Sequence, residues 1–214
     1  MRKTFVPFLS FCFMILLTGC SSAPLNLEIA KDDVMSYYDS GKYDAELDNV
    51  VKHAETEFNS IQPGDSTVVV FDVDETILSS YDFEKELDFG YVMPLWNKFI
   101  SEAKEPAIKQ TKSLYDLLVK RGFRIIFLTG RKNDQYNATY KNLINEGFAK
   151  FDTLIVRQPP EYDLTALKYK SLQRTELANR GYKIAGTIGD QYSDLDGPYH
   201  GIQIKIPNYM YIIK

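Results

Sequence analysis

The sequence contains little cysteine, with only Cys12 and Cys20 among its 214 residues. We expect Cys12 to leave with an N-terminal signal, so that Cys20 has no partner and an intramolecular disulfide is excluded. Cysteine-based phosphate chemistry is also not expected, because it needs an arginine shortly after the cysteine, at the position that Asn26 occupies here.

An excess of positive charge is absent as well. The formal net charge is −4, and it becomes −6 when Arg2 and Lys3 are removed with the signal. A broad basic surface for a nucleic-acid polymer is therefore not expected. Internal repeats and low-complexity tracts are also missing, and the roughly 195 residues left after the signal suffice for one α/β domain with an inserted cap.

Long hydrophobic runs are limited to the N-terminus. After Arg2 and Lys3, the apolar run 5–17 is too short to span a bilayer and is typical of a secretory signal. Residues 17–20, Leu-Thr-Gly-Cys, resemble a bacterial lipobox, which implies that Cys20 is diacylated and becomes the first mature residue. The alternative is a hydrophobic signal that happens to contain a cysteine. We therefore expect a lipoprotein of the bacterial cell envelope, anchored at Cys20 on the outer side of the cytoplasmic membrane or in the outer membrane.

The remaining chain alternates between apolar β-branched runs and amphipathic segments. We predict a signal at 1–19, a tether at 20–35 and one domain at 36–214, with a small cap at about 77–105. The domain begins with a predicted helix over 36–61. Alternating strands and helices with short loops predict an α/β fold, a mostly parallel sheet with helices on both faces. The predicted strands are 67–71, 124–128, 153–156, 183–188 and 201–206, and the predicted helices among them are 108–119, 134–147 and 170–181.

Two carboxylates follow the first predicted strand. The run 67–71 reads as a buried parallel strand, and Asp72 and Asp74 come directly after it, at the edge where open α/β sheets bind their ligands. Two carboxylates separated by one residue can share a divalent cation and still act differently, one as nucleophile and one as proton donor. This spacing favours phosphoryl transfer. The alternative is an ordinary solvated turn.

The second predicted strand ends in Thr129, Gly130 and Arg131. In a parallel sheet Thr129 emerges on the same edge as Asp72, where its hydroxyl and the following backbone N–H groups can hold phosphate oxygens. The alternative is a strand-to-helix turn with Thr129 as a capping residue. Arg131 can pair with phosphate as well, and its alternative is an exposed structural arginine. Lys170, predicted at a helix start, can reach the same phosphoryl group as a point charge.

Asp190 and Asp194 follow the fourth predicted strand. Their position brings Asp190 near Asp72, where oxygen ligands suit Mg²⁺, the usual partner of phosphate. A calcium-binding EF-hand loop starting at Asp190 is excluded, because Tyr192 and Gly201 stand where ligands are needed. A plain acidic surface turn is the alternative.

These motifs together resemble those of the haloacid dehalogenase (HAD) superfamily. Residues 72–76, 129–131, Lys170 and 189–194 stand in the order of its four motifs. The residues within these motifs resemble those of subfamily IIIB, the class B acid phosphatase branch. This branch includes bacterial lipoprotein acid phosphatases and plant vegetative storage proteins. The likeness covers residues 66–206 and implies a HAD-like Rossmannoid domain with a small cap.

The resemblance implies a Mg²⁺-dependent phosphomonoesterase acting on small phosphorylated substrates. Asp72 would attack phosphorus to form an aspartyl-phosphate, and Asp74 would protonate the leaving alcohol and later activate water. The Asp72 carboxylate, the Asp74 backbone carbonyl and the Asp190 carboxylate would hold Mg²⁺. Lys168 is the other lysine near the third motif, but the residues after Lys170 match the family pattern better. The remaining implied roles are phosphate binding by Thr129, Gly130 and Lys170, and support of the metal shell or of Lys170 by Asp194.

The aromatic residues of the predicted cap leave the substrate open. Their rings can stack on a nucleobase or an aryl group, but Trp96 and Phe99 are more readily explained as packing the cap against the domain. Two other functions are consistent with the sequence: a phosphotransferase on the same scaffold, and a non-catalytic surface lipoprotein that binds a ligand. The oligomeric state is not predicted.

Overall fold

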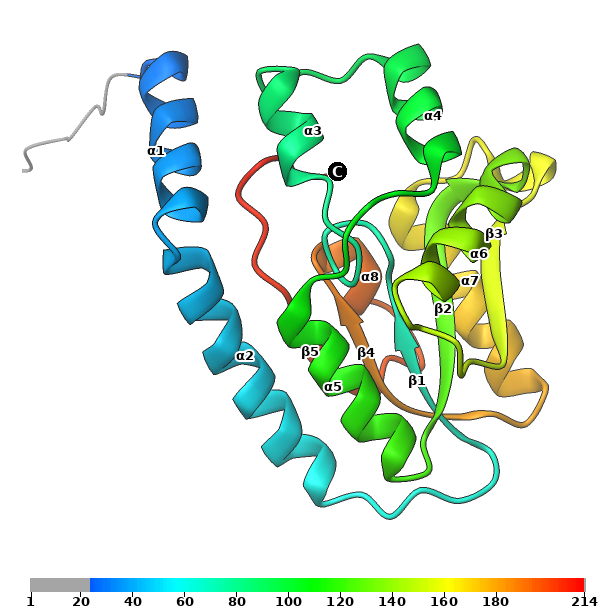
Figure 1. Ribbon diagram of the computed structural model, residues 1–214. Helices are drawn as coiled ribbons and strands as arrows, with labels where there is room; N and C mark the ends of the chain where they lie inside the picture. Colours follow the sequence, from blue (N-terminus) through cyan, green and yellow to red (C-terminus); the bar gives the residue numbers. More distant parts are fainter. Residues whose placement is uncertain (1–23, 214) are drawn as a thin grey trace, which may run out of the picture.

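The computed structural model describes residues 24–213 and has a five-stranded sheet at its centre (Figure 1). The strand order is β3-β2-β1-β4-β5, and every neighbouring pair is parallel. This confirms the predicted α/β class and places β1 in the middle of the sheet. The strands are β1 (Thr67–Phe71), β2 (Arg124–Lys132), β3 (Thr153–Arg157), β4 (Lys183–Gly189) and β5 (Ile202–Lys205).

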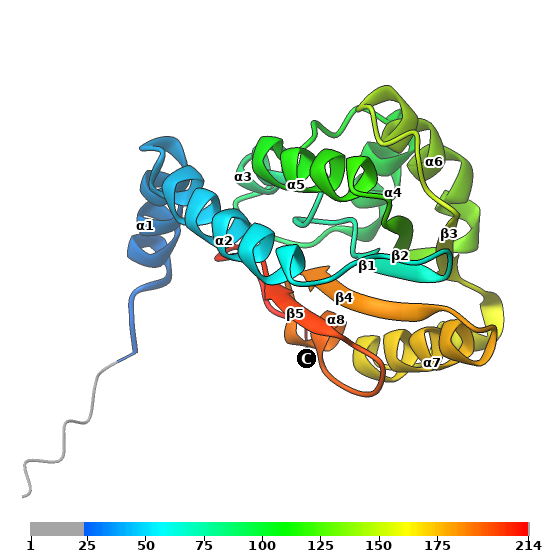
Figure 2. The same ribbon diagram turned by 90° about the horizontal axis from the view of Figure 1, so that it is seen from below.

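Helices cover both faces of this sheet (Figure 2). In β1, Val69 and Phe71 pack into the core formed with α2, α5 and α6, whereas Val68 and Val70 pack against α7. Because both faces are covered, all five residues of β1 are buried, which explains its continuous apolar sequence. The helices involved are α2 (Lys42–Asn59), α5 (Lys109–Lys120), α6 (Tyr136–Asn145), α7 (Ala166–Asn179) and the short α8 (Tyr192–Leu195).

The segment between β1 and α5 forms the cap. It contains α3 (Tyr81–Glu86) and α4 (Met93–Glu102), which lie beyond the carboxyl edge of the sheet in Figure 1. Phe83 of α3 stacks on Phe99 of α4 with ring centroids 4.2 Å apart, and Trp96 lies 5.9 Å from Phe83. These rings therefore pack the two cap helices against each other.

The N-terminal part of the domain differs from the sequence-based prediction. α1 (Leu27–Asp39) occupies much of the predicted tether, because the Asn26 side chain accepts hydrogen bonds from the N–H groups of Glu28 and Ile29 and caps a helix there. The single helix predicted over 36–61 is also wrong. Gly41 has a left-handed backbone (φ 77°) and separates α1 from α2. The predicted signal and Cys20 lie outside the described residues.

One boundary near the site also needs correction. α7 begins at Ala166 rather than at Lys170, because the Thr165 side chain caps it by accepting from Lys168 N–H. Lys170 therefore lies one turn inside the helix, with its side chain buried. Among residues 24–213, no helix combines the length and apolar character needed to cross a bilayer.

Candidate active site

The carboxyl ends of β1 and β4 bring Asp72 and Asp190 together. The Asp72 N–H continues the ladder by donating to the Ile188 carbonyl at 2.9 Å. Thr76 joins the two loops, since its hydroxyl accepts from Asp190 N–H at 3.0 Å and donates to Asp72 Oδ2 at 3.2 Å. Glu75, the residue before it, has a left-handed backbone (φ 52°) that turns the chain back toward β4.

Three buried carboxylates converge at this edge. Ligand oxygens of Asp72, Asp190 and Asp194 lie within 4.8 Å of one another. Lys170 binds two of them, donating to Asp72 Oδ1 and, at 2.5 Å, to Asp194 Oδ1. The structure thus brings together four of the predicted site residues and places Asp194 in contact with Lys170, while its supporting role stays a prediction.

Burial makes this group of charges unfavourable on its own. Burial raises the pKa of Asp72 well above its ordinary value, against the opposing effect of Lys170. Burial and the nearby Asp194 raise the pKa of Asp190 to about 7. Burial alone would lower the pKa of Lys170, but the Asp194 and Asp72 carboxylates raise it, so the lysine stays charged.

The charge balance suits a bound cation. Three carboxylates face one ammonium group, so the ionised cluster has an excess of negative charge on side chains that are buried. A divalent cation with oxygen ligands would offset that excess, and a hard ion such as Mg²⁺ matches an all-oxygen donor set. The residues present therefore fit the metal that the sequence predicted.

Asp74 belongs to a second, separate group of charges. Its carboxylate accepts from Arg131 Nε at 3.0 Å, from Arg131 Nη2 at 2.8 Å and from the Thr129 hydroxyl at 3.2 Å. Arg131 Nη2 also donates to both oxygens of Glu105, at 2.8 and 2.6 Å. Arg131 is therefore not the exposed structural arginine considered from the sequence. It is 4% exposed and bridges Asp74 to Glu105, which is 1% exposed.

The two phosphate-binding candidates on β2 differ in their surroundings. Gly130 is exposed and lines a large cavity between the cap and the carboxyl edge of the sheet. Thr129 is fully buried, with its hydroxyl engaged by Asp74 and by the Arg131 N–H at 3.1 Å. The structure therefore places both beside Asp74, while their roles toward phosphate stay predictions.

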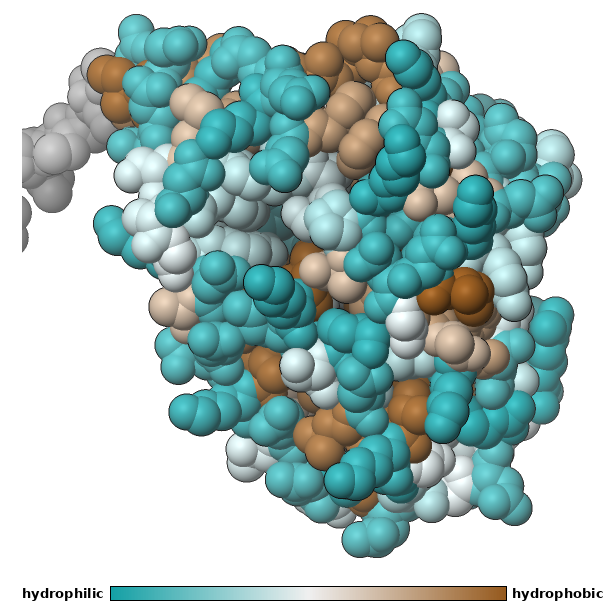
Figure 3. Space-filling view, viewed as in Figure 1, coloured by the Kyte–Doolittle hydropathy of each residue, from teal (hydrophilic) through white to brown (hydrophobic). Residues whose placement is uncertain are grey.

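A cavity of about 680 Å³ lies between the cap and the carboxyl edge of the sheet. Its floor carries the acidic cluster, Lys170 and Asp74, and its walls carry aromatic rings from the cap and from the C-terminal segment. Figure 3 views the molecule in the same orientation as Figure 1 and shows an apolar patch over the outer end of α4, where Val92, Met93 and Leu95 are exposed. The aromatic residues along the cavity are Phe89, Tyr91, Trp96, Tyr162 and Tyr211.

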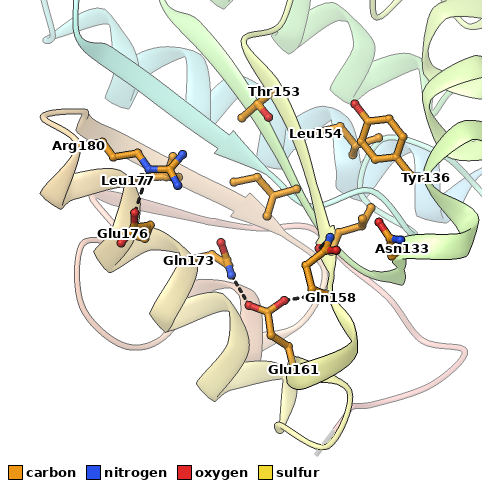
Figure 4. A pocket seen from close by; sticks show the side chains of 12 residues that line it. Asn133, Tyr136, Thr153, Leu154, Gln158, Glu161, Gln173, Glu176, Leu177 and Arg180 are labelled. Carbon is orange, nitrogen blue, oxygen red and sulfur yellow. Dashed lines mark hydrogen bonds and ion pairs between the residues drawn. The ribbon is translucent and has the colours of Figure 1, made fainter.

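A second cavity, of about 400 Å³, lies between β3 and α7 (Figure 4). Glu161 accepts there from Gln173 Nε2 at 2.6 Å and from Gln158 N–H at 2.8 Å, so its carboxylate is already satisfied. None of the predicted site residues lines this cavity. The chemistry therefore belongs to the larger cavity.

Sequence reasoning missed several residues of the site: Glu105 and Asn208 lie outside every motif, and Gln191 and Glu75 lie within motifs but were given no role. Glu105 follows the cap, far from every motif, and it reaches the site only because the cap folds back. Asn208 and Gln191 each donate an amide N–H to Asp190 Oδ2, at 2.7 and 2.6 Å. Glu75 is buried beside Asp74 and accepts from Ser80 N–H and Ser80 hydroxyl, at 2.5 and 2.6 Å. Glutamate and asparagine are common residue types, and no spacing marks Glu105 or Asn208.

Comparison with known proteins identifies the family. A model described as HAD superfamily, subfamily IIIB (Acid phosphatase) matches residues 18–214. Acid phosphatase 1 of Solanum lycopersicum is 34% identical over 192 residues, which make up 87% of this chain and 75% of that protein. The chain therefore belongs to the HAD-type acid phosphatases of subfamily IIIB, as the resemblance predicted.

Two further proteins are similar over part or most of the chain. Stem 31 kDa glycoprotein of Glycine max is 36% identical over 152 residues, 69% of this chain and 60% of that protein. The class C acid phosphatase from Bacillus anthracis, solved with tungstate bound, shares the fold with a TM-score of 0.70 at 20% identity, covering 87% of this chain and 85% of that one.

Removing Arg131 should leave the buried Glu105 carboxylate without a cationic partner. In Arg131→Met, Glu105 keeps no cation, and we expect the free energy of unfolding at about pH 8 to fall by about 3–5 kcal/mol. Denaturant unfolding monitored by circular dichroism measures this. The double variant Arg131→Met/Glu105→Leu should recover much of the loss because it removes both charges. Lys112→Met breaks an exposed pair with Asp116 and should cost less than about 1 kcal/mol. Equal losses in the two single variants would contradict this account.

The pH dependence of the free energy of unfolding should reveal the raised pKa of the Glu75 carboxyl group. Burial raises the pKa of Glu75 from 4.5 to about 8, although Ser80 donates two hydrogen bonds to it. Between these values the folded state binds more protons than the unfolded state, so stability falls as pH rises, by up to ~1.4 kcal/mol per pH unit from this group. Glu75→Gln should remove this contribution and flatten the stability curve between pH 5 and 8, as measured by urea unfolding. The exposed Glu57→Gln is the control, and an unchanged slope in Glu75→Gln would refute the assignment.

Proposed function

We propose that this acid phosphatase family member is a Mg²⁺-dependent phosphomonoesterase that hydrolyses small phosphate monoesters, with nucleoside monophosphates as a candidate class. One observation carries the proposal. Asp72 lies in a buried, cation-suited cluster with Lys170, while Asp74, which lines the same cavity, is bound by Arg131 instead. Two carboxylates that are separated by one residue in sequence thus have different environments, as a nucleophile and a proton donor require.

The first half of the reaction follows from these positions. An Asp72 carboxylate oxygen attacks phosphorus, the bond from phosphorus to the ester oxygen breaks, and Asp74 delivers a proton to the departing oxygen. Lys170 balances charge on the phosphoryl oxygens and holds Asp72 in place. Arg131 is shared between the Asp74 and Glu105 carboxylates, so its guanidinium is held beside Asp74 by two counter-charges.

The second half releases phosphate. Asp74, now ionised, takes a proton from water, which attacks the phosphorus of the aspartyl-phosphate and frees the Asp72 carboxylate. Mg²⁺, held by Asp72, Asp190 and the Asp74 backbone carbonyl, would neutralise the phosphoryl group when bound. The cap narrows access to this edge and gives the leaving group an aromatic wall.

Replacing the nucleophile should abolish turnover. In Asp72→Asn we expect release of phosphate from p-nitrophenyl phosphate to fall to background, because enzymes accelerate monoester hydrolysis by up to ~10²¹-fold and the amide cannot form the proposed aspartyl-phosphate. Asp65→Asn, which changes an exposed carboxylate before the opposite end of β1, is the control and should retain activity. Near-normal turnover by purified Asp72→Asn would end the covalent proposal.

The same assay distinguishes a phosphomonoesterase from a phosphotransferase and from a non-catalytic binding protein. A panel of nucleoside monophosphates, with Mg²⁺ or EDTA between about pH 4 and 8, should show EDTA-sensitive phosphate release. Transfer of phosphate to an added alcohol or sugar instead of water would favour a phosphotransferase. Tight binding of a phosphate ester without turnover would favour a non-catalytic lipoprotein.

We also propose that the chain works in the bacterial cell envelope, anchored by lipid at Cys20. The support is the basic, apolar and Leu-Thr-Gly-Cys order of residues 1–20. The residues between Cys20 and the start of α1 at Leu27 would connect the lipid to the domain.

Cys20→Ser should release the protein from membranes. Expressed in a bacterial host, the parent chain should sediment with the membrane fraction, and Cys20→Ser should appear in the soluble fraction or keep an uncleaved signal, as the mass of the purified protein would reveal. An unmodified, soluble parent chain would instead support a signal that merely contains a cysteine.

A further inference from the structure

We propose that the C-terminal segment 207–213 is a positioning element of the cation site, acting through Asn208 and Gln191 on Asp190. This inference rests on the proposed metal-dependent function. The segment 207–213 lies outside the four motifs, whereas Gln191 lies inside the fourth. The segment contributes through contacts that the fold creates.

Two amides take up one oxygen of Asp190. Asn208 Nδ2 and Gln191 Nε2 donate to Asp190 Oδ2, at 2.7 and 2.6 Å. The other oxygen, Oδ1, has only a longer contact of 3.4 Å with the Thr76 hydroxyl. The carboxylate is therefore held by one oxygen, and the second is left for the cation.

The segment also decides which way both amides point. The Met210 N–H donates to Asn208 Oδ1 at 2.9 Å, and the Ile213 N–H donates to Gln191 Oε1 at 3.0 Å. Since a backbone N–H can only donate, each amide must turn its oxygen toward the segment and its NH₂ toward Asp190. Neither amide can then flip and present an oxygen to the carboxylate.

The segment is itself fixed on its other side. The Tyr209 hydroxyl donates to Glu46 of α2, at 2.9 Å from Oε2, and the Tyr209 ring meets Tyr37 of α1 edge-on with centroids 5.1 Å apart. In Figure 1 the segment, drawn in red, leaves the carboxyl edge of the sheet and runs along the α1–α2 side of the molecule up to α3. It therefore connects the N-terminal helices to a cation ligand.

Partners of this kind matter for metal affinity because they orient the ligating group before the ion arrives. Loss of such a hydrogen bond typically weakens metal binding by about 10- to 100-fold. Asn208 is the residue to test, because its donor bond to Asp190 is its only contact with the acidic cluster.

The test measures Mg²⁺ binding directly, by isothermal titration calorimetry without substrate. Asn208→Ala should raise the Kd for Mg²⁺ by about 10- to 100-fold relative to the parent chain. The matched control is Gln203→Ala, because Gln203 Nε2 donates to the Leu195 carbonyl at 2.8 Å beside α8 and touches no carboxylate of the cluster. The control should leave the Kd unchanged.

Folding is checked by Tm without metal, and each titration is run below the Tm of its variant. If Asn208→Ala lowers that Tm strongly, Asn208→Ser provides the same comparison with a smaller change. An unchanged Kd in the Asn208 variant, or an equal increase in Gln203→Ala, would overturn the inference while leaving the proposed function intact. Absence of Mg²⁺ binding by the parent chain would overturn the metal-dependent function itself.

Discussion

The repulsion among Asp72, Asp190 and Asp194 is the constraint around which this edge of the molecule is organised. Their oxygens lie within 4.8 Å of one another, and all three side chains are buried. Lys170 offsets part of that charge, and a cation would offset the rest. Such a cluster can be held only by elements that are stable without it. Here it sits on β1 and β4, whose residues are covered by helices on both faces.

A single intervening residue separates the cluster from the other charge system. Val73 is fully buried and packs into the main core, which anchors the chain between Asp72 and Asp74. Directly after it, the left-handed backbone at Glu75 turns the chain so that Thr76 can reach back to Asp190. Asp72 is thereby committed to the cluster with Lys170, and Asp74 to Arg131 and Glu105. The different surroundings of the two aspartates are therefore a property of this turn rather than of either side chain.

The predictable part of the structure is the part with local signals. The apolar run of β1 and the strand-helix alternation indicate a parallel sheet, and parallel strands bring Asp72, Thr129 and Asp190 to one edge. Gly189 shows how tightly such a motif is constrained, since a Cβ at this position would collide with the Asp194 side chain. The helix boundaries were less predictable, because they depend on a capping side chain at Asn26 and Thr165 and on one left-handed residue, Gly41.

Long-range partners leave no such trace in a single sequence. Glu105 becomes part of the site only when the cap returns to the domain, where its N–H and carbonyl exchange hydrogen bonds with the Asn142 side chain at 2.9 and 2.7 Å. Asn208 reaches Asp190 only because β5 ends beside β4 and the chain then crosses the carboxyl edge. Both act by orienting charged groups whose own motifs are recognisable. The motifs therefore mark the carboxylates and the lysine of the site, whereas Glu105 and the C-terminal segment supply contacts that hold Arg131 and Asp190 in place.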